Sequence, residues 1–133
     1  MSNANVALAQ SLYAAFGRDD IATIVGAMAS DVTLEVVGRA KDYTLLGVRK
    51  GQDGVREFFR LIGELQEVVA FAPRDFHVSG DMVFVLGSEG WKLRKTGKPV
   101  DTEWVHVFTI KGGKVTAFRE FTDTAQFAEA YRG

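Results

Sequence analysis

Residues 103–121, EWVHVFTIKGGKVTAFREF, contain two runs of β-branched and aromatic residues on either side of a Gly-Gly pair. This composition, interrupted by two glycines, predicts an antiparallel β-hairpin. His106 lies in the middle of the first run, and Glu120 lies near the end of the second. An imidazole and a carboxyl group within an apolar hairpin are costly unless each has a partner. The two side chains therefore either satisfy each other or act on a third molecule.

The alignment of the two strands decides whether His106 and Glu120 meet. If Gly112-Gly113 forms a two-residue type I′ turn, His106 lies opposite Arg119, and the two polar side chains point to opposite faces. Matching of apolar residues across the hairpin favours this first alignment.

A second alignment follows if residues 111–113 form a three-residue loop with a bulge at its last glycine. His106 then lies opposite Phe118, and Trp104 lies opposite Glu120, so all four side chains share one face. A slip of one residue thus changes the chemistry of the hairpin.

The rest of the chain alternates between two kinds of pattern. Apolar residues at intervals of three and four predict helices, whereas β-branched runs separated by Gly and Asp predict strands. The expected helices cover residues 3–17, 20–28 and 51–66, with a short last helix capped by Asp123; the expected strands cover 32–38, 68–78, 82–95, 100–111 and 114–122, with a polar loop at 38–50.

Helices first and an antiparallel meander afterwards predict a single α+β domain over residues 1–133. In this fold one curved antiparallel sheet carries helices against one face. Residues 83–86 are continuously apolar, so both faces of that strand should be covered. Because the helices cover one face only, we expect a homodimer through the outer face of the sheet.

Composition excludes several classes of protein. With 16 basic and 17 acidic residues and no basic stripe, the sequence does not predict nucleic-acid binding. The absence of cysteine removes disulfides, thiolate metal sites and thiol nucleophiles. The first residues lack the pattern of a signal peptide, and no apolar run is long enough to span a membrane. We therefore expect a cytoplasmic protein without membrane contacts.

Four segments together resemble one family. GRDD at 17–20, SDVTLEVVG at 30–38, GQDGVREFF at 51–59 and TGKPVDTEWVHVFTIKGGKVTAFREFTDT at 96–124 are similar to the SnoaL-like branch of the ketosteroid isomerase and nuclear transport factor 2 superfamily. The resemblance extends over essentially the whole chain. It implies a cone-shaped, strongly bent antiparallel sheet, closed by three helices around an apolar pocket and dimerising through its outer face.

The resemblance also implies an active site. SnoaL-like cyclases use a His on one strand and an acidic residue fourteen positions later, both facing the pocket, and His106 and Glu120 have this separation. The resemblance therefore favours the second alignment, which we expect here. The cyclases carry Asp where this chain has Glu120, which is longer by one bond.

A pocket imidazole can accept and return a proton, and a neighbouring carboxylate can fix its tautomer. Such a pair suits isomerisation, aldol-type cyclisation or dehydration of a small apolar carbonyl compound, without a metal or an organic cofactor. The alternatives are a non-catalytic ligand-binding module and a dimerisation module of the same fold. The residues expected to line the pocket and bind substrate are Tyr13, Phe16, Met28, Phe59, Trp104 and Phe118.

Other polar residues receive structural interpretations. Glu89 and Trp91 fall on the opposite face of their strand from Phe84 and Leu86, which predicts a place at the dimer interface.

Two further side chains also receive structural interpretations. His77 precedes a turn and should face solvent, and Arg119 should form a cross-strand ion pair with Glu103.

Overall fold

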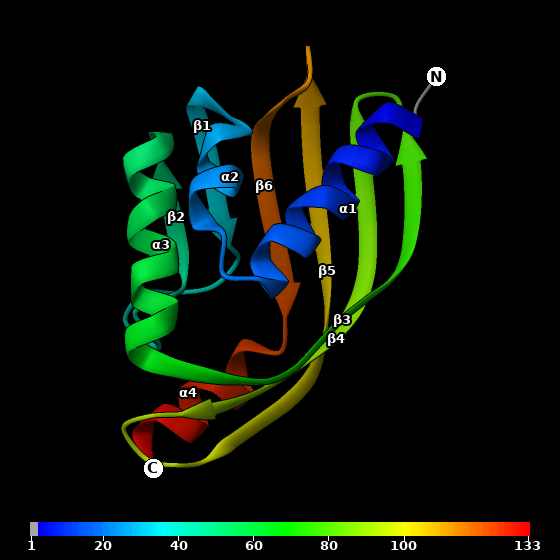
Figure 1. Ribbon diagram of the computed structural model, residues 1–133. Helices are drawn as coiled ribbons and strands as arrows, with labels where there is room; N and C mark the ends of the chain where they lie inside the picture. Colours follow the sequence, from blue (N-terminus) through cyan, green and yellow to red (C-terminus); the bar gives the residue numbers. More distant parts are fainter. Residues whose placement is uncertain (1–2) are drawn as a thin grey trace.

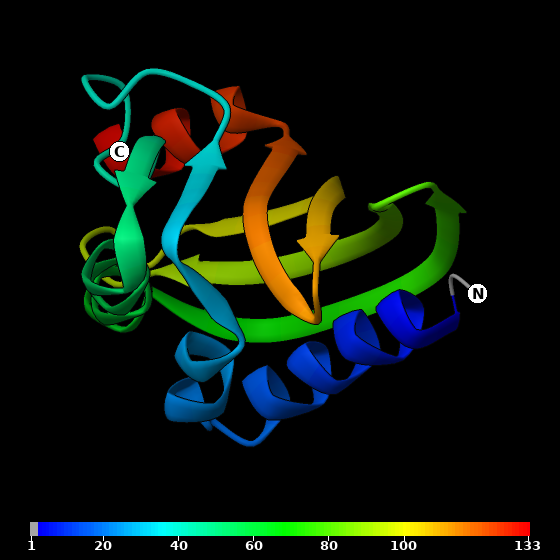
Figure 2. The same cartoon turned by 90° about the horizontal axis from the view of Figure 1, so that it is seen from above.

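One strongly curved sheet of six strands organises the chain, and the longer helices lie against it (Figure 1). The computed structural model describes residues 3–133. Seen from above, the strands bend sharply, and α1 runs along one side of the molecule (Figure 2). The elements are α1 (Asn3–Gly17), α2 (Ile21–Gly26), β1 (Met28–Val36), β2 (Gly47–Lys50), α3 (Gly51–Leu65), β3 (Gln66–Ser79), β4 (Met82–Leu93), β5 (Pro99–Lys111), β6 (Lys114–Thr122) and α4 (Thr124–Arg132).

The strand order is β2-β1-β6-β5-β4-β3, and the sheet is mixed rather than wholly antiparallel as expected. The exception is β1, which runs parallel to β6 with Leu34 paired to Phe118. A parallel pair needs a long crossover connection, and here most of the chain lies between the two strands. This α+β architecture otherwise matches the sequence-based expectation.

Several element boundaries differ from the expected ones, and the first strand begins four residues earlier than expected, at Met28 instead of Val32. The second helix ends at Gly26 rather than continuing to Met28, which is the first residue of β1. The expected loop at 38–50 contains the short strand β2, whose Gly47 pairs with Val36 of β1. As expected, Asp123 caps α4 by accepting a hydrogen bond from the backbone N–H of Gln126 at 3.4 Å.

The hairpin turn is the tight one. Gly112 and Gly113 have φ of 57° and 75°, which is the left-handed conformation that a type I′ turn needs at both central positions. Ile110 pairs with Val115 next to this turn, as in the first alignment.

A bulge nevertheless shifts the register, and it lies on β6 rather than at the turn. Ile110 pairs with Val115, but Thr109 pairs with Ala117, so Thr116 is the extra residue. Beyond the bulge, His106 and Glu120 lie directly opposite each other.

The second alignment, which the resemblance favoured, is therefore wrong in its pairs. Phe118 pairs with Phe108, and Trp104 pairs with Thr122. The physical reason is that the bulge adds its residue to β6, which shifts the pairing in the opposite direction from a three-residue turn. The two polar side chains still share one face, because directly opposite residues point to the same side of a sheet.

The two faces of β4 have different surroundings. Val83 and Val85 are fully buried on the concave face, whereas Met82 and Leu86 are 36% and 39% exposed on the convex face. Leu86 pairs with Val105, which in turn pairs with Phe121, so these three side chains form one row across the convex face. Within residues 3–133, no helix is long and apolar enough to cross a membrane.

Candidate functional site

A cavity of about 100 Å³ lies between the concave face of the sheet and the helices. Its walls come from all the helices and from the sheet, and most of the lining side chains are apolar. The interior is therefore not completely filled. Five of the residues expected in the pocket wall line this cavity: Tyr13, Phe16, Met28, Phe59 and Phe118.

Trp104, the sixth expected wall residue, lies behind the wall. Its indole ring stacks on His106, with 3.7 Å between ring centroids and 14° between ring planes, and it also stacks on Phe71. Gly87 of β4 makes room for the indole, because a Cβ at this position would collide with it. Trp104 thus supports the imidazole from behind instead of contacting the cavity.

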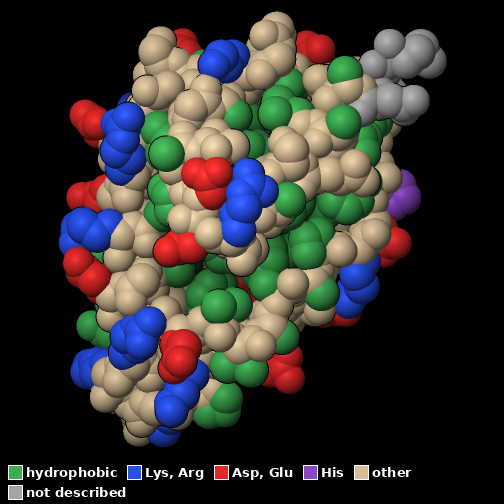
Figure 3. Space-filling model, viewed as in Figure 1, with side chains coloured by type: hydrophobic (Ala, Val, Ile, Leu, Met, Phe, Trp, Pro, Cys, Tyr) green, Lys and Arg blue, Asp and Glu red, His purple; other side chains and the backbone are tan. Residues whose placement is uncertain are grey.

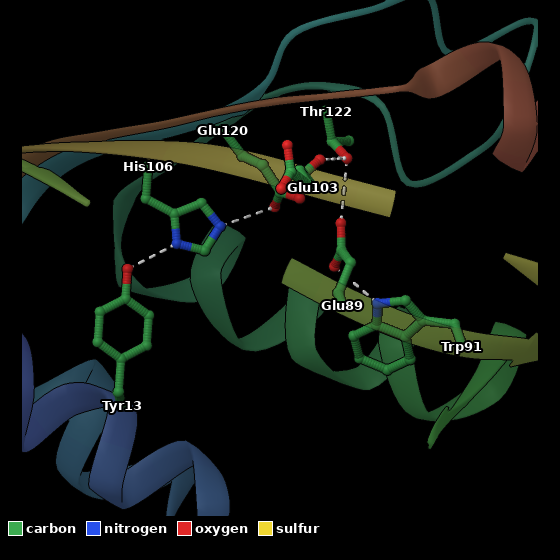
Figure 4. Close-up of polar contacts among 7 residues, drawn as sticks. All are labelled: Tyr13, Glu89, Trp91, Glu103, His106, Glu120 and Thr122. Atoms are coloured by element: carbon green, nitrogen blue, oxygen red, sulfur yellow. Dashed lines mark hydrogen bonds and ion pairs between the residues drawn. The ribbon is translucent and has the colours of Figure 1, made fainter. Parts of the chain in front are cut away.

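His106 is held on one side by Tyr13 of α1. The Tyr13 hydroxyl lies 2.7 Å from Nδ1 of His106 (Figure 4). Burial raises the pKa of Tyr13 and lowers the pKa of His106 to about 3. Both side chains are therefore neutral near pH 7. A Tyr13 hydroxyl that donates to Nδ1 leaves the hydrogen of the imidazole on Nε2.

Glu120 lies on the other side of His106. Its Oε1 is 3.5 Å from Nε2 of His106, and Nε2 has no hydrogen-bond partner within the described part of the chain. Burial raises the pKa of Glu120 to about 7. Near neutral pH this carboxyl group can both hold and release a proton.

Glu89 is the residue of the site that sequence reasoning missed. It was expected at a dimer interface, but it is 4% exposed and lines the cavity together with Trp91. Oε1 of Glu89 accepts a hydrogen bond from the Trp91 indole at 2.7 Å, and Oε2 lies 3.1 Å from the Thr122 hydroxyl (Figure 4). Burial, and then the proximity of Glu120, raises the pKa of Glu89 to about 8.

The signal for Glu89 was present in the sequence. Residues at odd positions of β4, from Val83 through Val85 to Glu89, point to one face. The apolar run at 83–86 places hydrophobic residues on both faces, so alternation alone could not show which face was the concave one.

Comparison with known proteins shows to which family the chain belongs. A model of the SnoaL-like domain matches residues 9–118. The chain belongs to the SnoaL-like domain family. A comparison of this SnoaL-like domain with curated proteins found no significant match.

Solved structures resemble this SnoaL-like domain over nearly its full length. An NTF2-like protein of unknown function from Burkholderia pseudomallei has 27% identity and a TM-score of 0.89, with 98% of each chain covered. An NTF2-like protein from Burkholderia xenovorans has 26% identity and a TM-score of 0.87, covering 97% of this chain and 96% of that one. TerC, crystallised with polyporic acid, has 28% identity and a TM-score of 0.84, covering 98% of this chain and 99% of that one.

The cavity of the SnoaL-like domain continues into an outer hollow of about 430 Å³. Tyr13, Phe16, Phe59 and Gln66 line both spaces, so the cavity and the hollow adjoin each other. Hydrophobic side chains gather on this face between the ends of α1 and α3 and are surrounded by charged ones (Figure 3). No cluster of three or more His, Asp or Glu side chains suited to a metal ion occurs within residues 3–133.

Of the two remaining predictions for polar residues, the one for His77 is confirmed and the one for Arg119 is wrong in its partner. His77 is exposed on β3, as predicted. Arg119, however, pairs with Glu35 at 3.1 Å instead of Glu103, which pairs with Arg74 at 3.3 Å. The parallel neighbour β1, which the sequence did not reveal, places Glu35 directly beside Arg119.

Proposed function

We propose that this SnoaL-like domain binds a small, largely apolar carbonyl compound in its cavity and moves a proton on it without a cofactor. The observation that carries the proposal is the chain of polar groups from Tyr13 through His106 to Glu120 in an otherwise apolar wall. Perturbed titratable groups that converge on an apolar cavity are typical of active sites. The crystallisation of TerC with polyporic acid supports small-molecule binding by this fold.

The roles of His106 and Glu120 follow from their protonation. The sequence suggested His106 as the acid and base, but a neutral imidazole whose pKa is about 3 is a weak proton acceptor. Glu120, with a pKa of about 7, is better matched to neutral pH. We therefore assign proton transfer to Glu120 and orientation of its carboxylate to His106, which Tyr13 holds in place.

The proposed reaction begins at a C–H bond next to a carbonyl group. The Glu120 carboxylate takes the proton, and the electron pair of the broken bond becomes the carbon–carbon double bond of an enolate. Return of the proton to another carbon isomerises the compound. Attack of the enolate carbon on a second carbonyl closes a ring, and the new alkoxide takes the proton back from Glu120. Loss of a neighbouring hydroxyl as water, again with the proton held by Glu120, dehydrates the compound. All three outcomes share the first step.

Exchange of carbon-bound hydrogen for solvent deuterium in β-tetralone, an apolar ketone, tests this first step. We expect the wild-type protein to accelerate the exchange, as followed by proton NMR. Glu120→Gln should reduce the accelerated rate by about 100-fold or more, because a positioned base contributes about 10²–10⁴. Glu103→Gln is the matched control, since this side chain is 79% exposed. Equal rates for the two variants would refute the assignment of Glu120.

The same assay addresses a non-catalytic ligand-binding module. The nearly apolar wall favours binding of an apolar molecule whether or not a reaction follows. Binding of β-tetralone without any exchange in the wild-type protein would support this second function. A dimerisation module with a filled interior is disfavoured by the cavity itself.

We also propose that two copies associate through the convex face of the sheet. The support is the row of Leu86, Val105 and Phe121, in which Leu86 and Phe121 are each 39% exposed. Met82 adds a further exposed apolar side chain to the same face. Apolar side chains grouped in this way are characteristic of protein–protein contacts.

A further inference from the structure

We propose that Glu89 is a second catalytic residue, a carboxylic acid that gives its proton to the carbonyl oxygen while Glu120 removes the proton from carbon. The reaction rests on the function proposed above. The protonated state of Glu89 does not, because it follows from contacts within the protein.

The hydroxyl of Thr122 shows where the proton lies. This oxygen is 2.8 Å from the carbonyl oxygen of Glu103 and 3.1 Å from Oε2 of Glu89. A hydroxyl has one hydrogen, and a carbonyl oxygen can only accept. If Thr122 donates to the closer carbonyl oxygen, the contact with Glu89 needs a hydrogen on Oε2. The carboxyl group then donates to Thr122.

The second contact of Glu89 agrees with this assignment. The Trp91 indole N–H is a donor only, and it donates to Oε1 at 2.7 Å. Oε1 is therefore the carbonyl oxygen of the acid and Oε2 is its O–H group. Both contacts are thus satisfied by one neutral carboxyl group.

Within residues 3–133, no Lys or Arg side chain lines the cavity to compensate a charge on Glu89. The titratable side chains that line the cavity with it are Glu120 from β6, His106 from β5, Tyr13 from α1 and Tyr43 from the segment between β1 and β2. None of the lining residues described is Lys or Arg, and α3 and α4 contribute apolar side chains. A second carboxylate beside Glu120 would be buried and unpaired, which is strongly unfavourable.

Glu89 is placed to act on the same ligand as Glu120. Its carboxyl group reaches Thr122, which lies two residues after Glu120 on the same face of β6. Such positions are about 7 Å apart along a strand. The carboxyl groups of Glu89 and Glu120 themselves lie within hydrogen-bonding reach of each other, a contact that opposes the rise in the pKa of Glu120, and both line the cavity. A carbonyl oxygen next to Thr122 would place its adjacent carbon toward Glu120.

A ligand oxygen can replace Thr122 as the acceptor of the Glu89 proton. Thr122 keeps its own hydrogen bond to the Glu103 carbonyl, so it loses only the contact with Glu89. The step then balances. Glu120 gains the proton from carbon, the C–H electron pair forms the carbon–carbon double bond, the carbonyl π pair takes the proton of Glu89, and an enol results. Reversal with the proton delivered to another carbon restores both carboxyl groups.

The protonation state can be measured without a ligand. In wild-type protein labelled with ¹³C at the glutamate carboxyl carbon, we expect one resonance to keep the shift of a protonated acid above pH 7 and to be the last to titrate. Glu89→Gln should remove this resonance, whereas Glu120→Gln and the exposed-site control Glu103→Gln should retain it. If the resonance lost in Glu89→Gln is instead one that titrates in the wild-type protein like those of exposed glutamates, the proposal is overturned.

The catalytic role is tested by the pH profile of deuterium exchange into β-tetralone. The wild-type rate should rise as Glu120 ionises near pH 7 and fall as Glu89 ionises near pH 8. Glu89→Gln should lower the maximum by about 100-fold, as expected for loss of a positioned acid, and abolish the fall at high pH. If the pH profile of Glu89→Gln is unchanged and its rate is within about threefold of wild type, Glu89 has only a structural role and the proposal is refuted.

The two measurements separate this proposal from the proposed function. If wild-type protein catalyses no exchange, the function fails, and the NMR titration still decides whether Glu89 holds a proton. If exchange depends on Glu120 but its pH profile ignores Glu89→Gln, the function stands and the second catalytic residue is refuted. Should Glu89→Gln fail to fold, the titration of the wild-type protein remains decisive. The late-titrating resonance is then assigned to Glu89 because it is retained in Glu120→Gln and Glu103→Gln.

Discussion

At the scale of single residues, the site is a set of polar side chains whose protonation is controlled by burial. Tyr13 and His106 are neutral and joined by one hydrogen bond, whereas Glu89 and Glu120 line a cavity to which the described residues contribute no Lys or Arg. The structure thus answers the question raised by the apolar hairpin. The imidazole has a partner, and the carboxyl groups keep protons that exposed carboxyl groups would lose.

This state of Glu89 predicts how stability depends on pH. The pKa of Glu89 is raised from an ordinary value of 4.5 to about 8 in the folded protein. Between these values the folded state binds a proton that the unfolded chain has lost, so the contribution of Glu89 to the free energy of unfolding decreases as pH rises. Above about pH 8 the decrease is complete.

We therefore expect Glu89→Gln to gain stability relative to wild type between pH 5 and pH 9. The variant has no carboxyl group to titrate at this position, and each unit of pKa shift corresponds to about 1.4 kcal/mol, so the gain can reach a few kcal/mol. Urea unfolding at several pH values measures it. A difference between the two proteins that stays constant with pH would contradict the raised pKa.

The sequence predicted part of this site. The resemblance to SnoaL-like cyclases, which share the fourteen-residue spacing of His106 and Glu120, led us to propose a pair, and the apolar periodicity of α1 brought Tyr13 into consideration. Glu89 could not be found in this way. Its place in the cavity depends on which face of β4 is concave, and the curvature of a sheet arises from packing and bulges that are absent from the local pattern.

At the scale of elements, the pairing of β4 with its neighbours β3 and β5 positions the imidazole. Gly87 of β4 is paired with Trp104 of β5, and a Cβ at Gly87 would collide with the indole and come within 2.6 Å of the backbone oxygen of Ala72. The indole in turn stacks on His106. A glycine in one strand therefore determines the position of a side chain in the site.

Gly87→Ala should destabilise the protein by about 2 kcal/mol or more, because overpacking of a well-filled interior typically costs 1–3 kcal/mol. Displacement of Trp104 should also slow the exchange of deuterium into β-tetralone. Gly90→Ala on the same strand is the matched control, since the nearest atom to its added Cβ would be 3.7 Å away. Equal stability of the two variants, measured by urea unfolding, would show that the packing around Gly87 relaxes easily.

Elements were easier to predict than their registers. The turn residues and alternating patterns located β4, β5 and β6 to within two residues at each end. The bulge at Thr116 had no signal of its own, because a threonine within a β-branched run is typical of any strand. The strand β2 and the parallel pairing of β1 were missed since both depend on contacts between distant segments.

At the scale of the whole molecule, the proposed dimer predicts the effect of charges on the convex face. The double variant Leu86→Lys and Phe121→Lys should convert a dimer into a monomer, because buried unpaired charges strongly oppose association. The double variant should still catalyse deuterium exchange into β-tetralone, since both substituted side chains point away from the cavity. Val48→Lys on β2 is the control, as Val48 is also exposed, at 55%. Sedimentation of the wild-type protein as a monomer would refute the dimer.

The strand order also has a consequence for synthesis of the chain. β6 lies between β1 and β5, so it is the only strand that joins β2-β1 to β5-β4-β3 in the six-stranded sheet. On the ribosome β6 is also the last of these six strands to emerge, and until then β1 and β5 each present an unpaired edge. The nascent protein must therefore keep two partial sheets apart from other chains, and closure waits for contacts between residues far apart in sequence, which form slowly.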